Sequence, residues 1–350
     1  MEHDDDSLDR DLIGLYLAER IAGFGTLGEI KRFRQGQSNP TYLLEAEGGR
    51  YVLRTQPPGK LLPSAHQVAR EYRVMQALAS TPVPVPRVHL LALAEDDSPL
   101  QRDFFVMDFV EGEIYWDPAL PTLDDATRGA IYDQQNLVLA QLHSVAVGAV
   151  GLGDFGKPGN YYARQIARWR KQYEASVLEP IPTMDWLMAW LDEHQPEDDG
   201  KVALVHGDYR LDNMIIQPKR PPQDTRIIAV LDWELSTLGH PYADLAYQCM
   251  QWRLPNTAAT RGLLGLAREK LGIPSEDDYV NTYCERRGEA PIDHWPFYLA
   301  FSFFRLAAIV QGVVKRAADG NASNPEQVEQ YRAMVPALST MAKDIVRRGN

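Results

Sequence analysis

The spacing of apolar residues changes near residue 110, and this change constrains the fold more than any other feature of the chain. Before it, short runs of β-branched and aromatic residues alternate with turn residues, which is typical of strands. One face of a following helical stretch carries side chains at spacings of three and four, namely Val68, Glu71, Tyr72, Met75 and Leu78. This part predicts a small sheet with a helix packed on it: strands 28–34, 40–47, 50–55, 87–94 and 103–109, and helices 8–22 and 66–80.

Beyond residues 111–113 the pattern becomes mainly helical. Helices are expected at 124–145, 161–176, 184–193 and from about 243 to the end, with short strands near 202–205, 213–217 and 226–231. The sequence therefore predicts an α+β fold of two lobes. Residues 1–110 would form a small antiparallel-sheet N-lobe, and residues 111–350 a larger, mainly helical C-lobe, with a connector near 107–113.

The charge of the chain is −12, from 36 basic and 48 acidic residues. Such a surface lacks the Lys/Arg footprint that phosphate backbones need, so no nucleic-acid partner is expected.

The isolated Cys249 and Cys284 fit a reduced compartment and give neither a zinc site nor a disulfide framework. No signal-peptide pattern is visible, and the apolar window 297–314 contains Arg305 and Gln311. We expect this window to be a buried helix, and the protein to be cytoplasmic without a membrane partner.

Two strand ends carry the residues that phosphoryl transfer from Mg-ATP needs. The run 204–213, LVHGDYRLDN, places Asp208 five residues before Asn213. In the run 230–234, VLDWE, Asp232 directly follows the apolar residues of a predicted strand. One carboxylate must accept the proton of the attacking hydroxyl, and a second carboxylate with a neutral oxygen must hold magnesium. Arg210 could reach the transferring phosphate. A lone aspartate after a strand is usually a turn or cap residue, but two such ends occurring together favour catalysis.

The N-lobe supplies partners for these groups and is expected to bind the nucleotide phosphates. Arg54 ends a predicted strand, and Glu71 lies on the apolar face of the next helix, where an unpaired carboxylate would be costly, so the two are expected to pair. The phosphate-covering loop is expected between two strands, at Gly36, Gln37, Ser38 and Asn39. A second glycine run, 23–28, follows a helix and is better explained as a turn. The hinge that binds adenine through its backbone is expected to include Met107, Asp108 and Phe109.

Three further polar residues have structural explanations that compete with functional ones. His206 precedes Gly-Asp in the loop and is expected to fix loop geometry, and His143 is most simply a capping or packing residue. Arg305 interrupts an apolar helix; it could bind an anionic group of the substrate, but a buried structural ion pair is the favoured interpretation. The sequence has no G-x-S-x-G nucleophile elbow and no H-E-x-x-H zinc motif, so a serine hydrolase and a zinc enzyme are not supported.

At these residues the chain resembles the aminoglycoside phosphotransferase/choline kinase family, which shares the protein-kinase fold. The resemblance covers about residues 25–345 and implies that Asp208 is the catalytic base and that Asn213 and Asp232 are magnesium ligands. It also implies that Asp244, in the run 243–246 (ADLA), braces the catalytic loop. Many members have Lys where this chain has Arg54, which leaves the choice between ATP and GTP open.

A narrower resemblance is to the branch found fused to acyl-CoA dehydrogenases, carried by the runs 51–54, 58–66 and 230–241. It implies an ATP- and Mg²⁺-dependent kinase for a hydroxyl of a small molecule, such as a hydroxy acid or a hydroxyacyl-CoA. Two alternatives stay open: an aminoglycoside-modifying phosphotransferase, and a non-catalytic kinase-fold protein that senses a nucleotide or metabolite. The acceptor and the oligomeric state cannot be derived from the sequence.

Overall fold

The N-terminal part of the chain is a five-stranded antiparallel sheet in the order β1-β2-β3-β5-β4. The computed structural model describes residues 8–33, 39–58, 67–96, 98–257, 260–320 and 327–349. The sheet and its two helices comprise α1 (Arg10–Arg20), β1 (Leu27–Arg32), β2 (Thr41–Ala46), β3 (Gly49–Thr55), α2 (Val68–Leu78), β4 (Val88–Ala92) and β5 (Phe104–Asp108). Each was expected from the sequence within a few residues. Of the predicted phosphate loop, Gly36, Gln37 and Ser38 lie outside the described residues.

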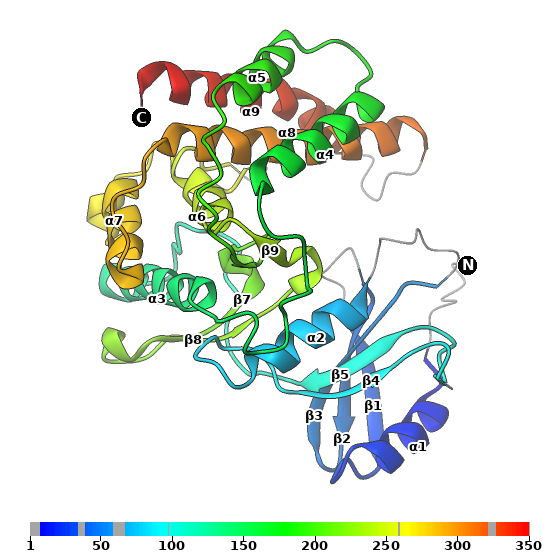
Figure 1. Ribbon diagram of the computed structural model, residues 1–350. Helices are drawn as coiled ribbons and strands as arrows, with labels where there is room; N and C mark the ends of the chain where they lie inside the picture. Colours follow the sequence, from blue (N-terminus) through cyan, green and yellow to red (C-terminus); the bar gives the residue numbers. More distant parts are fainter. Residues whose placement is uncertain are drawn as a thin grey trace.

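The two helices cover opposite faces of this sheet (Figure 1). Because side chains alternate along a strand, Leu53 and Val106 pack toward α1, while Val52 and Met107 lie on the α2 face. The core on the α2 face is continuous with that of the helical lobe. The α2 face of the sheet is therefore the side that meets the rest of the protein.

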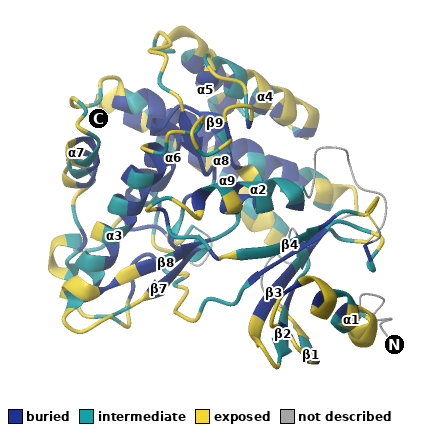
Figure 2. Cartoon of the chain, turned by 60° about the horizontal axis from the view of Figure 1, so that its bottom comes forward, coloured by how far each residue is buried: buried dark blue, intermediate teal, exposed yellow. Residues whose placement is uncertain are grey.

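The C-terminal part is built around one long helix, α8 (Trp295–Ala318), which packs against α4, α5, α6 and α9. The other helices are α3 (Asp125–His143), α4 (Tyr161–Ser176), α5 (Pro182–Glu193), α6 (Tyr242–Cys249), α7 (Glu276–Arg287) and α9 (Val328–Arg348). Among the described residues, only α8 is long and apolar enough to cross a membrane, and 83% of its apolar window is buried inside the protein. Figure 2 shows this burial along α8, which agrees with the buried helix expected from Arg305 and Gln311.

Two small antiparallel sheets position the loops that carry the conspicuous polar residues. β6 (Ala203–Val205) pairs with β9 (Thr237–Gly239), and β7 (Met214–Gln217) pairs with β8 (Arg226–Val230). These pairings bring 206–213 and 231–236 side by side. Short 3₁₀ helices lie at Leu211–Asn213, Pro222–Asp224, Trp233–Leu235, Met250–Trp252 and Arg268–Leu271. β9 was not expected, because its residues Thr-Leu-Gly lack the apolar run that marks the equally short β6. The α+β architecture itself is confirmed.

Candidate active site

Asp244 fixes the backbone of the loop that follows β6. It stands in the first turn of α6 and is fully buried. Its Oδ2 accepts a hydrogen bond from the backbone N–H of His206 at 2.6 Å, and its Oδ1 accepts one from the N–H of Gly207 at 2.8 Å. Burial would raise the pKa of Asp244, but hydrogen bonding to His143 and the nearby imidazoles hold it below its usual value. The carboxylate therefore stays charged and holds the backbone of the loop by two hydrogen bonds.

His143 supports this aspartate from the last turn of α3. Its Nε2 lies 3.3 Å from Asp244 Oδ2, and its Nδ1 lies 2.7 Å from the hydroxyl of Tyr283. Burial lowers the pKa of His143, against the opposing influence of Asp244. The neutral ring can donate from Nε2–H to Asp244 and accept at Nδ1 from the hydroxyl of Tyr283. In this tautomer the imidazole, the carboxylate and the phenol each have a hydrogen-bond partner. The sequence suggested only capping or packing for His143, since nothing in its local pattern reveals a partner 101 residues away.

His206 ties the two polar loops together. Its Nδ1 accepts from the N–H of Asp208 at 3.2 Å, which leaves Nε2 to donate to the carbonyl of Leu231 at 2.9 Å. The ring is fully buried and packs against Trp233, with centroids 4.6 Å apart. The residue thus fixes loop geometry and holds the segment before Asp232 next to Asp208.

The carboxylate of Asp208 is held at both oxygens. Tyr247 donates from its hydroxyl to Oδ1 at 2.9 Å, and Asn213 donates from Nδ2 to Oδ2 at 3.0 Å. Burial would raise the pKa of Asp208, but the charge of Arg210 and the hydrogen bond from Tyr247 hold it below its usual value. The side chain keeps 25% exposure, so a ligand can reach it. Arg210 lies 3.7 Å from Oδ1 and also pairs with Asp212.

A second cluster surrounds Arg54, at the end of β3. Its Nε lies 3.0 Å from Glu71 Oε2, and its Nη2 lies 2.8 Å from Asp232 Oδ1. The expected pair with Glu71 is therefore present. The third carboxylate, Glu234, lies 3.9 Å from Arg54 Nη2, and the amide of Asn39 donates to both Glu71 and Glu234. Of the predicted phosphate loop, only Asn39 is described, and it is buried in this network.

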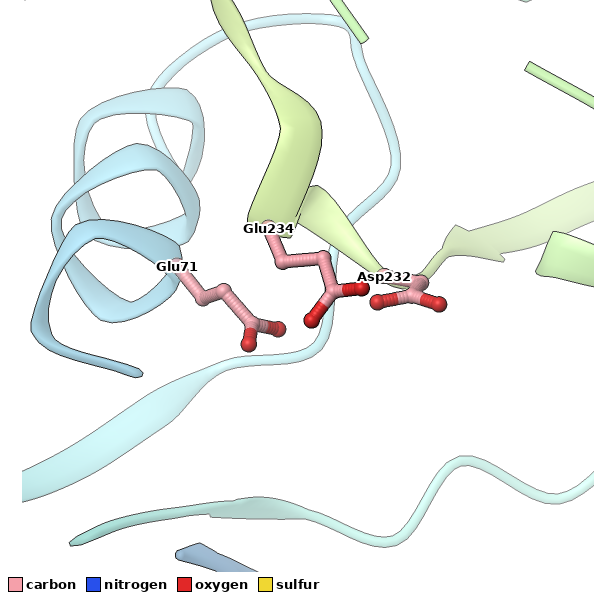
Figure 3. A group of neighbouring side chains, drawn as sticks. All are labelled: Glu71, Asp232 and Glu234. Atoms are coloured by element: carbon pink, nitrogen blue, oxygen red, sulfur yellow. The ribbon is translucent and has the colours of Figure 1, made fainter. Parts of the chain in front are cut away.

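The three carboxylates of this cluster point toward one another, Glu71 from α2 and the others from the turn after β8 (Figure 3). They can each offer an oxygen within 4.8 Å of the others, a set that could hold a metal ion. Burial raises the pKa of Glu71 to about 7 against the charge of Arg54. The backbone of Asp232 is left-handed, with φ of 63°. Sequence reasoning missed Glu234, although it stands only two residues after Asp232.

A cleft of about 400 Å³ separates the sheet from the two loops. Arg54, Glu71, Asn213 and Asp232 line one part of it. The remaining wall is largely apolar and includes Val52, Met75, Phe105, Met107, Phe109, Val110, Ile215 and Leu231. The expected hinge residues Met107, Asp108 and Phe109 all lie on this wall. The backbone N–H groups of Asp108 and Phe109 already donate to the carbonyls of Arg87 and Arg50.

A second, polar pocket of about 260 Å³ lies beside the catalytic-loop candidates. Trp116 and Asp212 line both this pocket and the cleft, so the two spaces adjoin. Arg210 and Arg261 also line it. The other lining residues are Gln251, Thr260, Gln327, Gln330 and Tyr331.

Arg305 lines neither of these two spaces. It is buried in α8, donates to the carbonyl of Gly207, and lies over the rings of Tyr247 and Trp169 at 5.1 and 5.6 Å. Because Arg305 is buried and its guanidinium already donates to a backbone carbonyl, a role in binding an anionic substrate group does not fit this position. The structural interpretation fits, with a backbone carbonyl and two aromatic rings in place of the acidic partner expected from the sequence.

Comparison with known proteins matches residues 29–279 to the model of the phosphotransferase enzyme family. Acyl-CoA dehydrogenase family member 10 of Mus musculus is 46% identical over 321 residues, which are 91% of this chain and 29% of that protein. The chain spans less than half the length of the curated relatives it matches.

Among solved structures, a Ralstonia eutropha JMP134 protein assigned to the aminoglycoside phosphotransferases is 43% identical, with a TM-score of 0.87 over 98% of this chain and 99% of that one. A thermostable mutant of the aminoglycoside phosphotransferase APH(4)-Ia, in ternary complex with ADP and hygromycin B, has a TM-score of 0.59 at 17% identity. That match covers 96% of this chain and 98% of the other, and it shows the shared fold alone.

Proposed function

Because the chain belongs to the phosphotransferase enzyme family, we propose that it transfers the γ-phosphoryl group of ATP to a hydroxyl of a small molecule. The observation that carries this proposal is the position of Asp208. Its ionised, partly exposed carboxylate belongs to a loop whose residues Asp212 and Asn213 line the cleft, while Arg210 and Asp212 line the polar pocket. Asp208 is not among the residues that line the cleft or the pocket, but residues of its loop line both, so a partly exposed base on this loop can act between two substrates.

The cleft suits a nucleotide. Its apolar wall matches the faces of a purine ring, and its polar end offers Arg54 to phosphates. The N–H groups of Asp108 and Phe109 are already bonded, so we assign the donor for adenine to the next N–H, that of Val110. Adenine recognition would thus fall at the end of the predicted hinge.

Magnesium fits the donor set at this end of the cleft. Asn213 uses its amide nitrogen on Asp208, so the amide oxygen is the end available to a hard cation. Asp232 is a third exposed and has Glu234 and Glu71 beside it. Asp232 and Asn213 would hold the ion, which when bound neutralises charge on the phosphates. Arg54 now pairs with Asp232 and balances these carboxylates.

The polar pocket is the place for the acceptor. Among the described residues, Arg210 and Arg261 are the basic residues that line it and Asp212 the acidic one, which pairs with Arg210. This balance favours a neutral or anionic acceptor, such as a hydroxy acid or a hydroxyacyl-CoA, over a polycationic aminoglycoside. The relatives named as acyl-CoA dehydrogenase family members support the same class.

An acceptor panel tests this function. ATP consumption with magnesium is measured against hydroxy acids, hydroxyacyl-CoA thioesters, amino alcohols and aminoglycosides. We expect turnover with an anionic class, abolished in Asp208→Ala, and a raised KM for that acceptor in Arg261→Ala. Turnover with aminoglycosides alone would contradict the assignment of the acceptor. Binding of Mg-ATP without turnover of any acceptor would favour a non-catalytic sensor.

A further inference from the structure

The hydroxyl of Tyr247 is the second anchor of the Asp208 carboxylate. Tyr247 stands one helical turn after Asp244 on α6, so both side chains reach the same loop. Asp244 holds the loop backbone, and Tyr247 reaches Asp208 Oδ1 at 2.9 Å. With Asn213 bonded to Oδ2, each oxygen of Asp208 has one donor, and rotation of the carboxylate about its Cβ–Cγ bond breaks both bonds.

The phenol is itself held in place. Tyr247 is buried, and the guanidinium of Arg305 lies 5.1 Å from the centroid of its ring. Arg305 also donates to the carbonyl of Gly207, the residue before Asp208. Burial raises the pKa of Tyr247, so its hydroxyl stays protonated and acts as the donor. The aromatic ring, the cation and the loop thus form one packed unit.

We propose that Tyr247 is a positioning residue, which holds the Asp208 carboxylate in the orientation that receives the acceptor proton. This inference rests on the proposed function. In the transfer, a bond forms between the acceptor oxygen and the γ-phosphorus, and the bond from this phosphorus to the β–γ bridging oxygen breaks. ADP leaves with that electron pair, and the acceptor proton passes to Asp208. If the carboxylate rotated freely, its lone pair would face the acceptor hydroxyl for a smaller fraction of the time, and proton transfer would be slower.

The variant Tyr247→Phe removes the hydroxyl and keeps the ring beneath Arg305. A hydrogen bond to a charged group is worth enough to change a rate by about 10-fold to 100-fold. We expect a fall in kcat of this order, with the KM values for ATP and acceptor within about 2-fold of wild type. A merely structural role would alter thermal stability and both KM values together.

Tyr242→Phe is the matched control, because Tyr242 lies on the same helix and its hydroxyl bonds Lys201 and Glu289 instead of Asp208. We expect its kcat to stay within about 3-fold of wild type, since no bond to the base is lost. An unchanged kcat in Tyr247→Phe, or an equal fall in both variants, would overturn the proposal.

Crystal structures of the two variants separate this proposal from the proposed function. We expect the Asp208 carboxylate to rotate or take two orientations in Tyr247→Phe and to keep its orientation in Tyr242→Phe. The same single orientation in both would overturn the positioning role, whatever the enzyme phosphorylates. A wild-type protein that transfers phosphate to no acceptor would refute the proposed function, and the orientation of Asp208 would still decide the role of Tyr247.

Discussion

Replacing Asp244 by asparagine should release the loop that carries the proposed base. The two side chains have the same shape, so the change alters hydrogen bonding and charge without leaving a cavity. Asp244 accepts from Gly207 N–H at Oδ1, and from His206 N–H and His143 Nε2 at Oδ2. An amide has one oxygen, so in either orientation its NH₂ group faces at least one N–H donor of the loop.

The magnitude follows from these contacts. The less damaging orientation places the amide nitrogen against Gly207, which loses one charge-assisted hydrogen bond of about 1.5–3 kcal/mol. The buried N–H left without a partner adds about 1–3 kcal/mol. Since the bonds kept by the amide oxygen also lose their charge assistance, we expect the free energy of unfolding to fall by roughly 3–5 kcal/mol.

Urea-induced unfolding, followed by circular dichroism, measures this loss. Asp277→Asn is the control, because Asp277 also stands in the first turn of a helix, α7, but is exposed. We expect it to cost less than about 1 kcal/mol. If Asp244→Asn unfolded at the same urea concentration as this control, the proposed bracing of the loop would be wrong.

Two other variants test the same region. Burial lowers the pKa of His143 in the folded protein below its ordinary value of 6.5, so the stability that the neutral ring confers is complete above pH 6.5 and is lost as the pH falls through the folded-state pKa. In His143→Gln, the urea concentration at the midpoint of unfolding should therefore fall less steeply with decreasing pH. An unchanged slope would refute this role of His143. Gly207 has a φ of +85°, and a Cβ at this position would lie 2.7 Å from the carbonyl oxygen of Leu235. Gly207→Ala should therefore lower the free energy of unfolding by about 2 kcal/mol or more and sharply lower kcat. Wild-type stability and activity in Gly207→Ala would show that the loop adapts at no cost.

Local sequence patterns predicted most of the architecture. Strands such as β3 and helices such as α2 carry their own periodicity, and the expected pairing of Arg54 with Glu71 follows from one buried carboxylate needing one cation. Asp208 and Asp232 were assigned to one site because each follows a predicted strand and phosphoryl transfer needs both a base and a metal ligand. In the structure the ladders β6–β9 and β7–β8 bring their loops together.

The missed residues depend on contacts between distant parts of the chain. His143 and Tyr247 sit in helices whose patterns indicate only burial, and their hydrogen-bond partners lie 101 and 39 residues away. Arg305 was recognised as unusual, but its hydrogen-bond partner is the backbone carbonyl of Gly207. Every residue has such a carbonyl, so the sequence cannot reveal which one is the partner. Such partners become visible only when α3, α6 and α8 are packed around the loop.

The most direct test of the account compares Asp208→Ala and Asp232→Ala in one set of measurements. Calorimetry of Mg-ATP binding and turnover of the acceptor found in the panel are measured for both variants. We expect Asp208→Ala to bind Mg-ATP about as well as wild type and to lose turnover, because Asp208 acts on the acceptor. Asp232→Ala should lose magnesium-dependent binding, since it removes a proposed ligand of the ion. Turnover near the wild-type rate in Asp208→Ala, or unchanged Mg-ATP binding in Asp232→Ala, would contradict the account.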